Sequence, residues 1–215
     1  MDSRTLLVVL LAAACGVLGW RWLRTGRYRR PDEGGLPLPR HLWVVGAAPF
    51  VGLVVERGLS DRPWPVLLAP LALALAGLVL AAVDADVHRL PNAITLPLVP
   101  VQAALLAVAS AATGDGGALA RAGLAALLVG GGTVLLAFVL FGRSIGMGDA
   151  KLMVSIAPTL AWLSWRTLAV GVWLGFVIGG LVAAGLLVTR RAQRSTQLAF
   201  GPYLVAGAVL AVALA

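Results

Sequence analysis

The chain has few charged residues, almost no cysteine and no cluster of metal-binding side chains. Only 12% of its 215 residues are charged, whereas 60% are hydrophobic. Its single cysteine, Cys15, cannot form an intramolecular disulfide or a zinc site, and we expect it to be a small buried helix residue. The two histidines, His41 and His88, are far apart in sequence, and we expect neither a GxSxG elbow of serine hydrolases nor a Walker loop. We therefore predict neither a metal nor a cofactor.

The chain contains several long apolar stretches. Several reach about 17–25 residues, the length that crosses a hydrocarbon core of roughly 30 Å. We predict an all-α fold, a polytopic integral membrane bundle of about eight transmembrane helices. The first stretch resembles a signal peptide, but its positive cluster follows it, so we interpret it as a retained helix. The sixth is the shortest and contains Pro158, so it should be tilted, kinked or only partly inserted. The eight predicted spans are 5–20, 41–58, 64–83, 93–112, 119–141, 150–164, 167–189 and 199–215.

The distribution of lysine and arginine predicts the orientation of the bundle. If the N-terminus lies outside, twelve basic residues fall on the inner face and five on the outer face, which fits the positive-inside rule. The net charge of +8 then indicates contact with anionic lipid headgroups, and we expect no nucleic acid partner. The inner set is Arg21, Arg24, Arg27, Arg29, Arg30, Arg40, Arg89, Arg143, Lys151, Arg190, Arg191 and Arg194, and the outer set is Arg4, Arg57, Arg62, Arg121 and Arg166.

Two segments are predicted on this basis. Residues 1–63 would hold the N-terminal transmembrane helices with a basic cytoplasmic loop at 21–40, and residues 64–215 would form a catalytic core. The loop is rich in arginine, proline and glycine, and its simplest interpretation is a segment held at anionic headgroups. The alternative is that it replaces a substrate-docking domain.

Three of the nine carboxylates are candidates for function, because ionisable side chains in or beside a membrane bundle are costly. Glu56, next to Arg57, is expected to pair or to reach the interface. Asp84, Asp86 and Asp149 remain, all at the predicted cytoplasmic ends of helices. Asp149 follows a Gly-Met-Gly sequence and could cap the helix after it. Two close carboxylates can also share a proton, one acting as a base on water while the other donates to a carbonyl oxygen.

Three stretches resemble the type IV prepilin peptidases, membrane aspartyl proteases of the GxGD kind that include the preflagellin peptidases. They are "DADVHRLPNAITLPL" (84–98), "GMGDAKLM" (146–153) and "FGPYLVAG" (200–207). The resemblance covers roughly residues 60 to 215 and implies that Asp84 and Asp149 are catalytic, whereas Asp86 misses the family's spacing to proline. The supporting motif residues that it implies are Leu90, Pro91, Asn92, Gly146, Gly148, Lys151, Phe200, Gly201 and Pro202.

The resemblance implies cleavage of the leaders of type IV prepilins, Tad/Flp pilins or pseudopilins at the cytoplasmic face of the prokaryotic inner membrane. Pilus or secretion assembly proteins are possible partners. Bifunctional members of the family also N-methylate the product and carry paired CxxC motifs, but residues 21–40 contain no cysteine. The chain therefore resembles the short forms, and methylation is doubtful. Two alternatives stay open: a proton- or cation-coupled transporter subunit, and a catalytically silent assembly scaffold.

Overall fold

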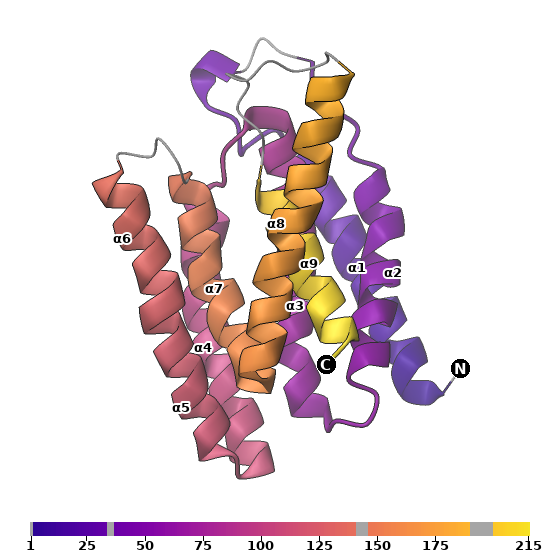
Figure 1. Cartoon of the computed structure of the whole chain (residues 1–215). Helices are drawn as coiled ribbons and strands as arrows, with labels where there is room; N and C mark the ends of the chain where they lie inside the picture. Colours follow the sequence, from indigo (N-terminus) through magenta and orange to yellow (C-terminus); the bar gives the residue numbers. More distant parts are fainter. Residues whose placement is uncertain (1, 34–36, 141–145, 190–199) are drawn as a thin grey trace.

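The computed structural model describes residues 2–33, 37–140, 146–189 and 200–215, and these residues are almost entirely helical (Figure 1). The helices α5 and α6 are joined by a π-helical segment, η2, into one continuous rod, so that the described chain forms eight rods. The elements are α1 (Ser3–Leu23), η1 (Pro31–Glu33), α2 (Trp43–Gly58), α3 (Trp64–Val87), α4 (Asn92–Thr113), α5 (Gly116–Ala125), η2 (Ala126–Gly131), α6 (Gly132–Val139), α7 (Met147–Leu163), α8 (Trp165–Val188) and α9 (Gly201–Ala213).

The predicted all-α membrane bundle of about eight helices is confirmed, with no strand in the described ranges. Five rods are long and apolar enough to cross a membrane, namely α1, α3, α4, the α5–α6 rod and α8. Helix α7 has 17 residues and continues through Pro158, while α9, with 13 residues, is shorter. The prediction that the sixth stretch is the shortest was therefore wrong.

The third predicted span ends too early. Helix α3 continues to Val87, so that Asp84 lies inside its last turn rather than after it. His88 ends the helix in the left-handed conformation, with φ 49°, and its backbone N–H donates to the carbonyl oxygen of Asp84. Apolar periodicity cannot show this boundary, because the carboxylates of the last turn are stabilised by contacts from distant segments, namely the start of α9 and the connection after α1.

Successive rods alternate in direction, so the loops gather at two ends of the bundle (Figure 1). We call the end with the last turns of α1 and α3 and the first turns of α4, α7 and α9 the site end. The described members of the predicted inner set of basic residues lie there, and the outer set lies at the other end. Four of the twelve inner residues, Arg143, Arg190, Arg191 and Arg194, fall outside the described residues. The predicted division of the basic residues into two faces therefore agrees, for the described residues, with the two ends of the bundle.

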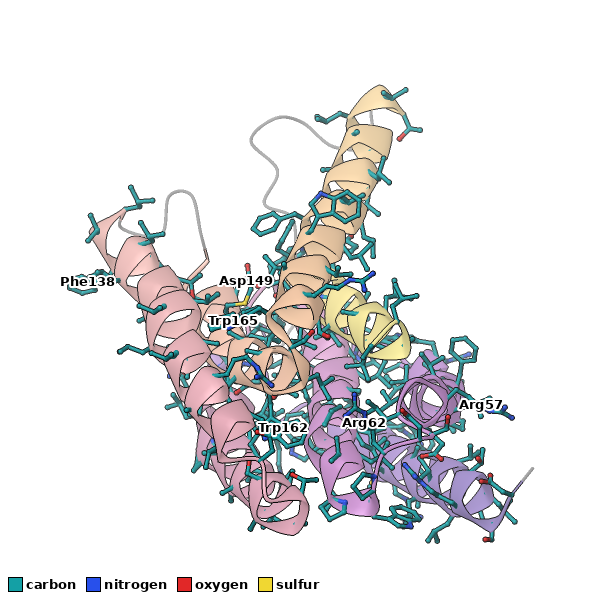
Figure 2. The ribbon with its side chains drawn as sticks, turned by 60° about the horizontal axis from the view of Figure 1, so that its bottom comes forward. Arg57, Arg62, Phe138, Asp149, Trp162 and Trp165 are labelled. Atoms are coloured by element: carbon teal, nitrogen blue, oxygen red, sulfur yellow. The ribbon has the colours of Figure 1, made fainter. Side chains whose placement is uncertain are left out.

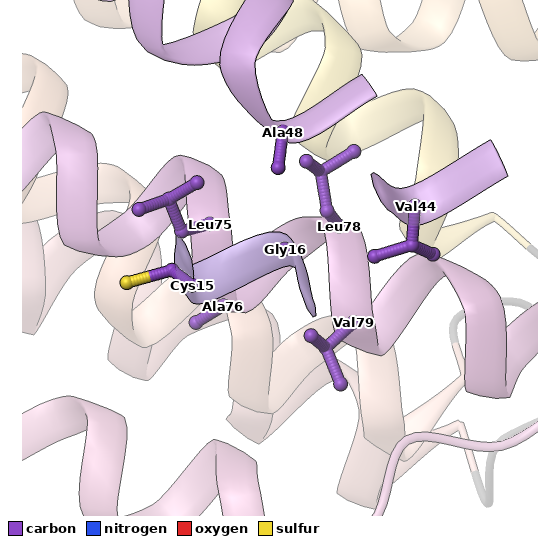
Figure 3. Close-up of a pocket in the computed structure, with 8 residues that line it drawn as sticks. All are labelled: Cys15, Gly16, Val44, Ala48, Leu75, Ala76, Leu78 and Val79. Atoms are coloured by element: carbon purple, nitrogen blue, oxygen red, sulfur yellow. The ribbon is translucent and has the colours of Figure 1, made fainter. Parts of the chain in front are cut away.

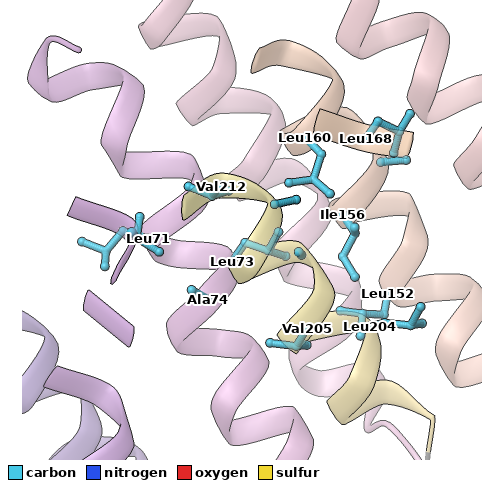
Figure 4. Close-up of a cluster of buried hydrophobic side chains, with 14 of the residues drawn as sticks. Leu71, Leu73, Ala74, Leu152, Ile156, Leu160, Leu168, Leu204, Val205 and Val212 are labelled. Atoms are coloured by element: carbon cyan, nitrogen blue, oxygen red, sulfur yellow. The ribbon is translucent and has the colours of Figure 1, made fainter. Parts of the chain in front are cut away.

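Helices α3, α7 and α9 enclose the main apolar core (Figure 4). In the most apolar 18-residue stretch of α3, 72% is buried inside the protein, whereas only 17% of the corresponding stretch of α8 is buried. Helix α3 is therefore central in the bundle and α8 peripheral. Large side chains at the periphery, such as Phe138 and Phe176, are exposed, and Phe138 projects away from the bundle (Figure 2). In a membrane this is the surface that faces lipid.

Two side chains differ from the sequence predictions at other places. Glu56 is 1% exposed and its carboxylate lies 3.1 Å from Nε of Arg4, so it pairs with α1 rather than with Arg57. Cys15 is exposed, at the edge of an apolar crevice between α1, α2 and α3 (Figure 3). Both differences arise from packing between helices α1, α2 and α3, which brings together residues far apart in sequence.

Candidate active site

Two carboxylates from different helices meet at the site end. Asp84 lies in the last turn of α3 and is 4% exposed, and Asp149 lies partly buried in the first turn of α7. Gly201, the first residue of α9, lies against both. A Cβ atom added to it would be 3.0 Å from Oδ2 of Asp84 and 3.5 Å from Oδ1 of Asp149. The two oxygens are therefore no farther apart than the sum of those distances, although the residues are 65 positions apart.

The start of α9 holds Asp84 directly. The backbone N–H of Gly201 donates to Oδ2 of Asp84 over 3.2 Å. Phe200 precedes it and packs its ring against Phe176 of α8, with ring centroids 5.3 Å apart. Pro202 occupies the first turn, where the missing N–H of proline costs no helical hydrogen bond. The Phe-Gly-Pro sequence thus places a small residue beside the carboxylates, and the N–H of that residue donates to one of them.

Asp149 does not cap its helix, and that prediction was wrong. The capping position of α7 is Gly146, and Asp149 is the third helical residue. A carboxylate there still lies near the positive end of the helix dipole. A Cβ atom on Gly146 would lie 3.1 Å from Oδ2 of Asp149, so the glycine leaves room for this carboxylate.

Leu90 connects the two helix ends that carry the acids. A Cβ atom on Gly148 would lie 3.2 Å from Cβ of Leu90 and 3.3 Å from its backbone nitrogen, so α7 packs directly on the chain between α3 and α4. The side chain of Leu90 also faces Gly201, at 3.4 Å from the position of an added Cβ. Leu90 is 7% exposed. Sequence reasoning noted it only as part of the proline motif and missed this packing role.

Asn92 and Lys151 lie next to each other at the surface of the site end. The Nζ atom of Lys151 donates to Oδ1 of Asn92 over 2.8 Å, joining the first turns of α7 and α4. Pro91 occupies the capping position of α4 with φ −69°. All eleven residues predicted from the three stretches therefore gather at one end of the bundle: Asp84, Leu90, Pro91, Asn92, Gly146, Gly148, Asp149, Lys151, Phe200, Gly201 and Pro202.

Asp86 faces a different neighbour from Asp84. Its carboxylate accepts hydrogen bonds from Nε and Nη2 of Arg29, at 2.9 and 2.8 Å, and from the hydroxyl of Tyr28 at 2.6 Å. Arg29 was predicted to contact lipid headgroups, but its guanidinium is bound to this carboxylate inside the protein. This part of the interpretation of the 21–40 loop was wrong, because burial of Asp86 favours a partner within the chain.

The paired carboxylates suit acid–base chemistry on water. Among the described residues, the ion pairs include neither Asp84 nor Asp149. Two nearby acids with little solvent and no neutralising cation disfavour double ionisation, so that one proton can be shared between them. Such a pair can deprotonate a water with one carboxylate and protonate an oxygen with the other. Within the described residues, no three His, Cys, Asp or Glu side chains are grouped in a way that could hold a metal ion.

Residues 142–146 fit the GxSxG pattern of serine hydrolases, so the expectation that this pattern is absent was wrong for the sequence itself. That pattern requires a turn from a strand to a helix. Here it joins α6 to α7, two helices, and Ser144 itself lies outside the described residues. The pattern therefore carries no argument for a serine nucleophile.

The fold and the site together define a polytopic helical membrane protein with two aspartates paired at one end of the bundle. The chain belongs to the type IV leader peptidase family, whose model matches residues 71–188. That range contains both aspartates and ends before Gly201. The family match gives no support to the transporter alternative.

Two curated relatives are similar over most of the chain. One is the prepilin leader peptidase/N-methyltransferase of Aeromonas hydrophila, 31% identical over 194 residues, which are 87% of this chain and 62% of the relative. The protein of the same name from Aeromonas salmonicida strain A449 is 30% identical over 191 residues, with the same coverage of both chains. The chain thus spans less than two thirds of the length of these relatives. No solved structure matches it significantly.

Proposed function

We propose that this protein is an aspartic endopeptidase of the membrane that removes the leader peptides of type IV prepilins or prepilin-like proteins. The observation that carries the proposal is the approach of Asp84 and Asp149 to the same side of Gly201, from helices α3 and α7. Family membership and the similarity to the Aeromonas prepilin leader peptidases support the substrate class.

In the proposed mechanism, the two carboxylates share one proton before the reaction. The ionised carboxylate removes a proton from a bound water, which attacks the scissile carbonyl carbon. The protonated carboxylate donates its proton to the carbonyl oxygen, which gives a tetrahedral intermediate. As the C–N bond breaks, the proton taken from water passes to the leaving amine, and a hydroxyl of the intermediate returns a proton to the ionised carboxylate, so that the pair again shares one proton. The N–H of Gly201 fixes Asp84 throughout, because it donates to Oδ2 from the rigid start of α9.

The direct test is co-expression with a type IV prepilin that carries its leader. We expect a leader-dependent decrease in the size of the prepilin, and N-terminal sequencing should show a single cleavage position at the end of the leader. The matched control is the same pilin expressed without its leader, whose size should not change. An unchanged leader-bearing prepilin, with this protein folded in the membrane, would contradict the proposal.

We further propose that the site end faces the cytoplasm of a prokaryotic inner membrane. Eight described lysines and arginines of the inner set lie at the site end, and the positive-inside rule places such an end in the cytoplasm. The basic side chains that remain exposed there can contact anionic headgroups. Assembly proteins of a pilus or secretion system are proposed as further partners.

Reporter fusions test this orientation. Fusions after Arg30 and within 88–91 should report the cytoplasm, and fusions after Asp61 and Asp115 should report the outside, because consecutive rods alternate in direction. A fusion at 88–91 that reports the outside would overturn the mechanism, since a leader retained in the cytoplasm could not reach the aspartates.

Cleavage should not depend on a metal or on the single thiol. The proposed steps use two carboxylates and water, so activity in the presence of EDTA, and that of Cys15→Ala, should stay within about twofold of the untreated wild type. The matured pilin should keep an unmethylated terminal amine, because residues 21–40 lack paired cysteines and Cys15 lies in an apolar crevice on α1. Mass spectrometry of the product measures both outcomes. Inactivation by EDTA, or one added methyl group that depends on this protein, would contradict these expectations.

A further inference from the structure

The segment from Arg24 to Glu33 binds the end of α3 at two places, one before and one after the last helical residue, Val87. On one side, Arg29 and Tyr28 bind the carboxylate of Asp86, and the side chains of the Arg29–Asp86 pair are 6% and 7% exposed. On the other side, Arg89 donates to Glu33 over 3.1 and 2.8 Å. These contacts join residues 56 to 58 positions apart. We call Tyr28, Arg29, Glu33, Asp86 and Arg89 the clamp.

The chemistry of the clamp makes it rigid. Arg29 binds both oxygens of Asp86, a two-point geometry that fixes orientation as well as distance. Arg89 also donates to the backbone carbonyl oxygen of Tyr28 over 2.8 Å, so the two halves of the clamp are connected. Burial and the hydrogen bond to Asp86 raise the pKa of Tyr28 to about 12, and the hydrogen bond from Arg89 lowers the pKa of Glu33 to about 2. Tyr28 therefore stays neutral and Glu33 stays charged at physiological pH.

The clamp encloses the part of the chain that positions the two aspartates. Asp84 lies two residues before Asp86, in the same helical turn, and Leu90 follows Arg89 directly. Leu90 packs against Gly148, the residue before Asp149, and faces Gly201. A movement of residues 86–89 would therefore displace Asp84 at one end and the support of α7 at the other.

We infer that Asp86 and Arg29 are positioning residues for the aspartate pair, a role that rests on the proposed peptidase function. They hold the last turn of α3 and the 88–91 connection so that Asp84 and Asp149 keep the separation needed to share a proton. Replacement of either partner breaks this buried two-point contact, so the end of α3 has to rearrange. Asp86 thereby influences the reaction without touching the substrate.

The test compares kcat and KM of purified protein in lipid nanodiscs, with a full-length prepilin as substrate. Asp86→Asn and Arg29→Gln should each lower kcat per folded molecule about tenfold with KM within about twofold, because small misplacements of catalytic groups act on the chemical step. Arg29→Lys, which keeps the charge but not the two-point contact, should recover part of the loss. The double variant should be no slower than either single variant, because both remove the same interaction. Arg27→Gln, an exposed arginine of the same segment, is the matched control and should resemble the wild type.

A second measurement separates this inference from the proposed function. Hydrogen–deuterium exchange of the amides of residues 84–90 should be faster in Asp86→Asn than in Arg27→Gln, whether or not the protein cleaves prepilins. If the wild type cleaves nothing but exchange rises, the proposed peptidase function fails and the clamp stands. If the variants keep the wild-type kcat per folded molecule, or if exchange is unchanged, the positioning role is wrong.

Discussion

Asp84→Asn and Asp149→Asn should each reduce leader cleavage by at least about 100-fold, with normal amounts of protein in the membrane. An amide of nearly the same size can neither accept the proton of a water nor donate an acidic proton to a carbonyl oxygen. The double variant should be about as inactive as each single one, because the two acids act as one unit. Cleavage of a prepilin during co-expression, quantified by band shift and by mass spectrometry, measures the loss.

Two control variants separate loss of a catalytic group from loss of a negative charge. Asp61→Asn changes an exposed carboxylate at the opposite end of the bundle and should leave cleavage unchanged. Asp86→Asn changes an acid in the same helical turn as Asp84 and should lose only about tenfold in cleavage, far less than Asp84→Asn, as expected of a residue that acts through position alone. An inactive Asp86→Asn together with an active Asp84→Asn would mean that the first catalytic acid is misassigned.

Gly207→Val should cost the protein most of its stability. A Cβ atom on Gly207 would lie 2.4 Å from the backbone nitrogen of Gly175 and 2.5 Å from the carbonyl oxygen of Gly171, so helices α8 and α9 touch through their backbones. Backbone atoms cannot turn aside as a flexible side chain can, and the helices would have to separate. Overpacking of this kind costs about 1–3 kcal/mol and sometimes more, and small residues are the usual means of close packing between membrane helices.

The control for this prediction is Gly180→Val. Gly180 is also a helical glycine of the bundle, on α8, but nothing lies within 4 Å of an added Cβ atom there. We expect Gly207→Val to lower the midpoint of thermal unfolding in detergent markedly and to lose cleavage, because α9 carries Gly201 to the aspartates. Gly180→Val should differ little from the wild type. An unfolding midpoint of Gly207→Val that equals that of Gly180→Val would contradict the packing shown by the structure.

The sequence by itself determined the fold class and the grouping of charges. Apolar stretches about as long as a bilayer is thick can only be satisfied as spanning helices, and their number and order predicted the bundle. Because consecutive spans must alternate in direction, the sequence also predicted that Asp84, Asp149 and the described basic residues of the inner set share one end. The resemblance of residues 84–98 and 146–153 to the type IV prepilin peptidases selected the two candidate acids.

Only the tertiary structure decided which polar side chains bind one another. Arg29 was interpreted as a lipid contact, whereas it pairs with Asp86. For Glu56 the sequence left pairing and a position at the interface open, and the structure pairs it with Arg4. Sequence reasoning also ended the third helix before Asp84 and made Asp149 a helix cap. These contacts depend on which faces of distant helices pack together, and a buried charge takes its partner from across that packing, which no local pattern of residues encodes.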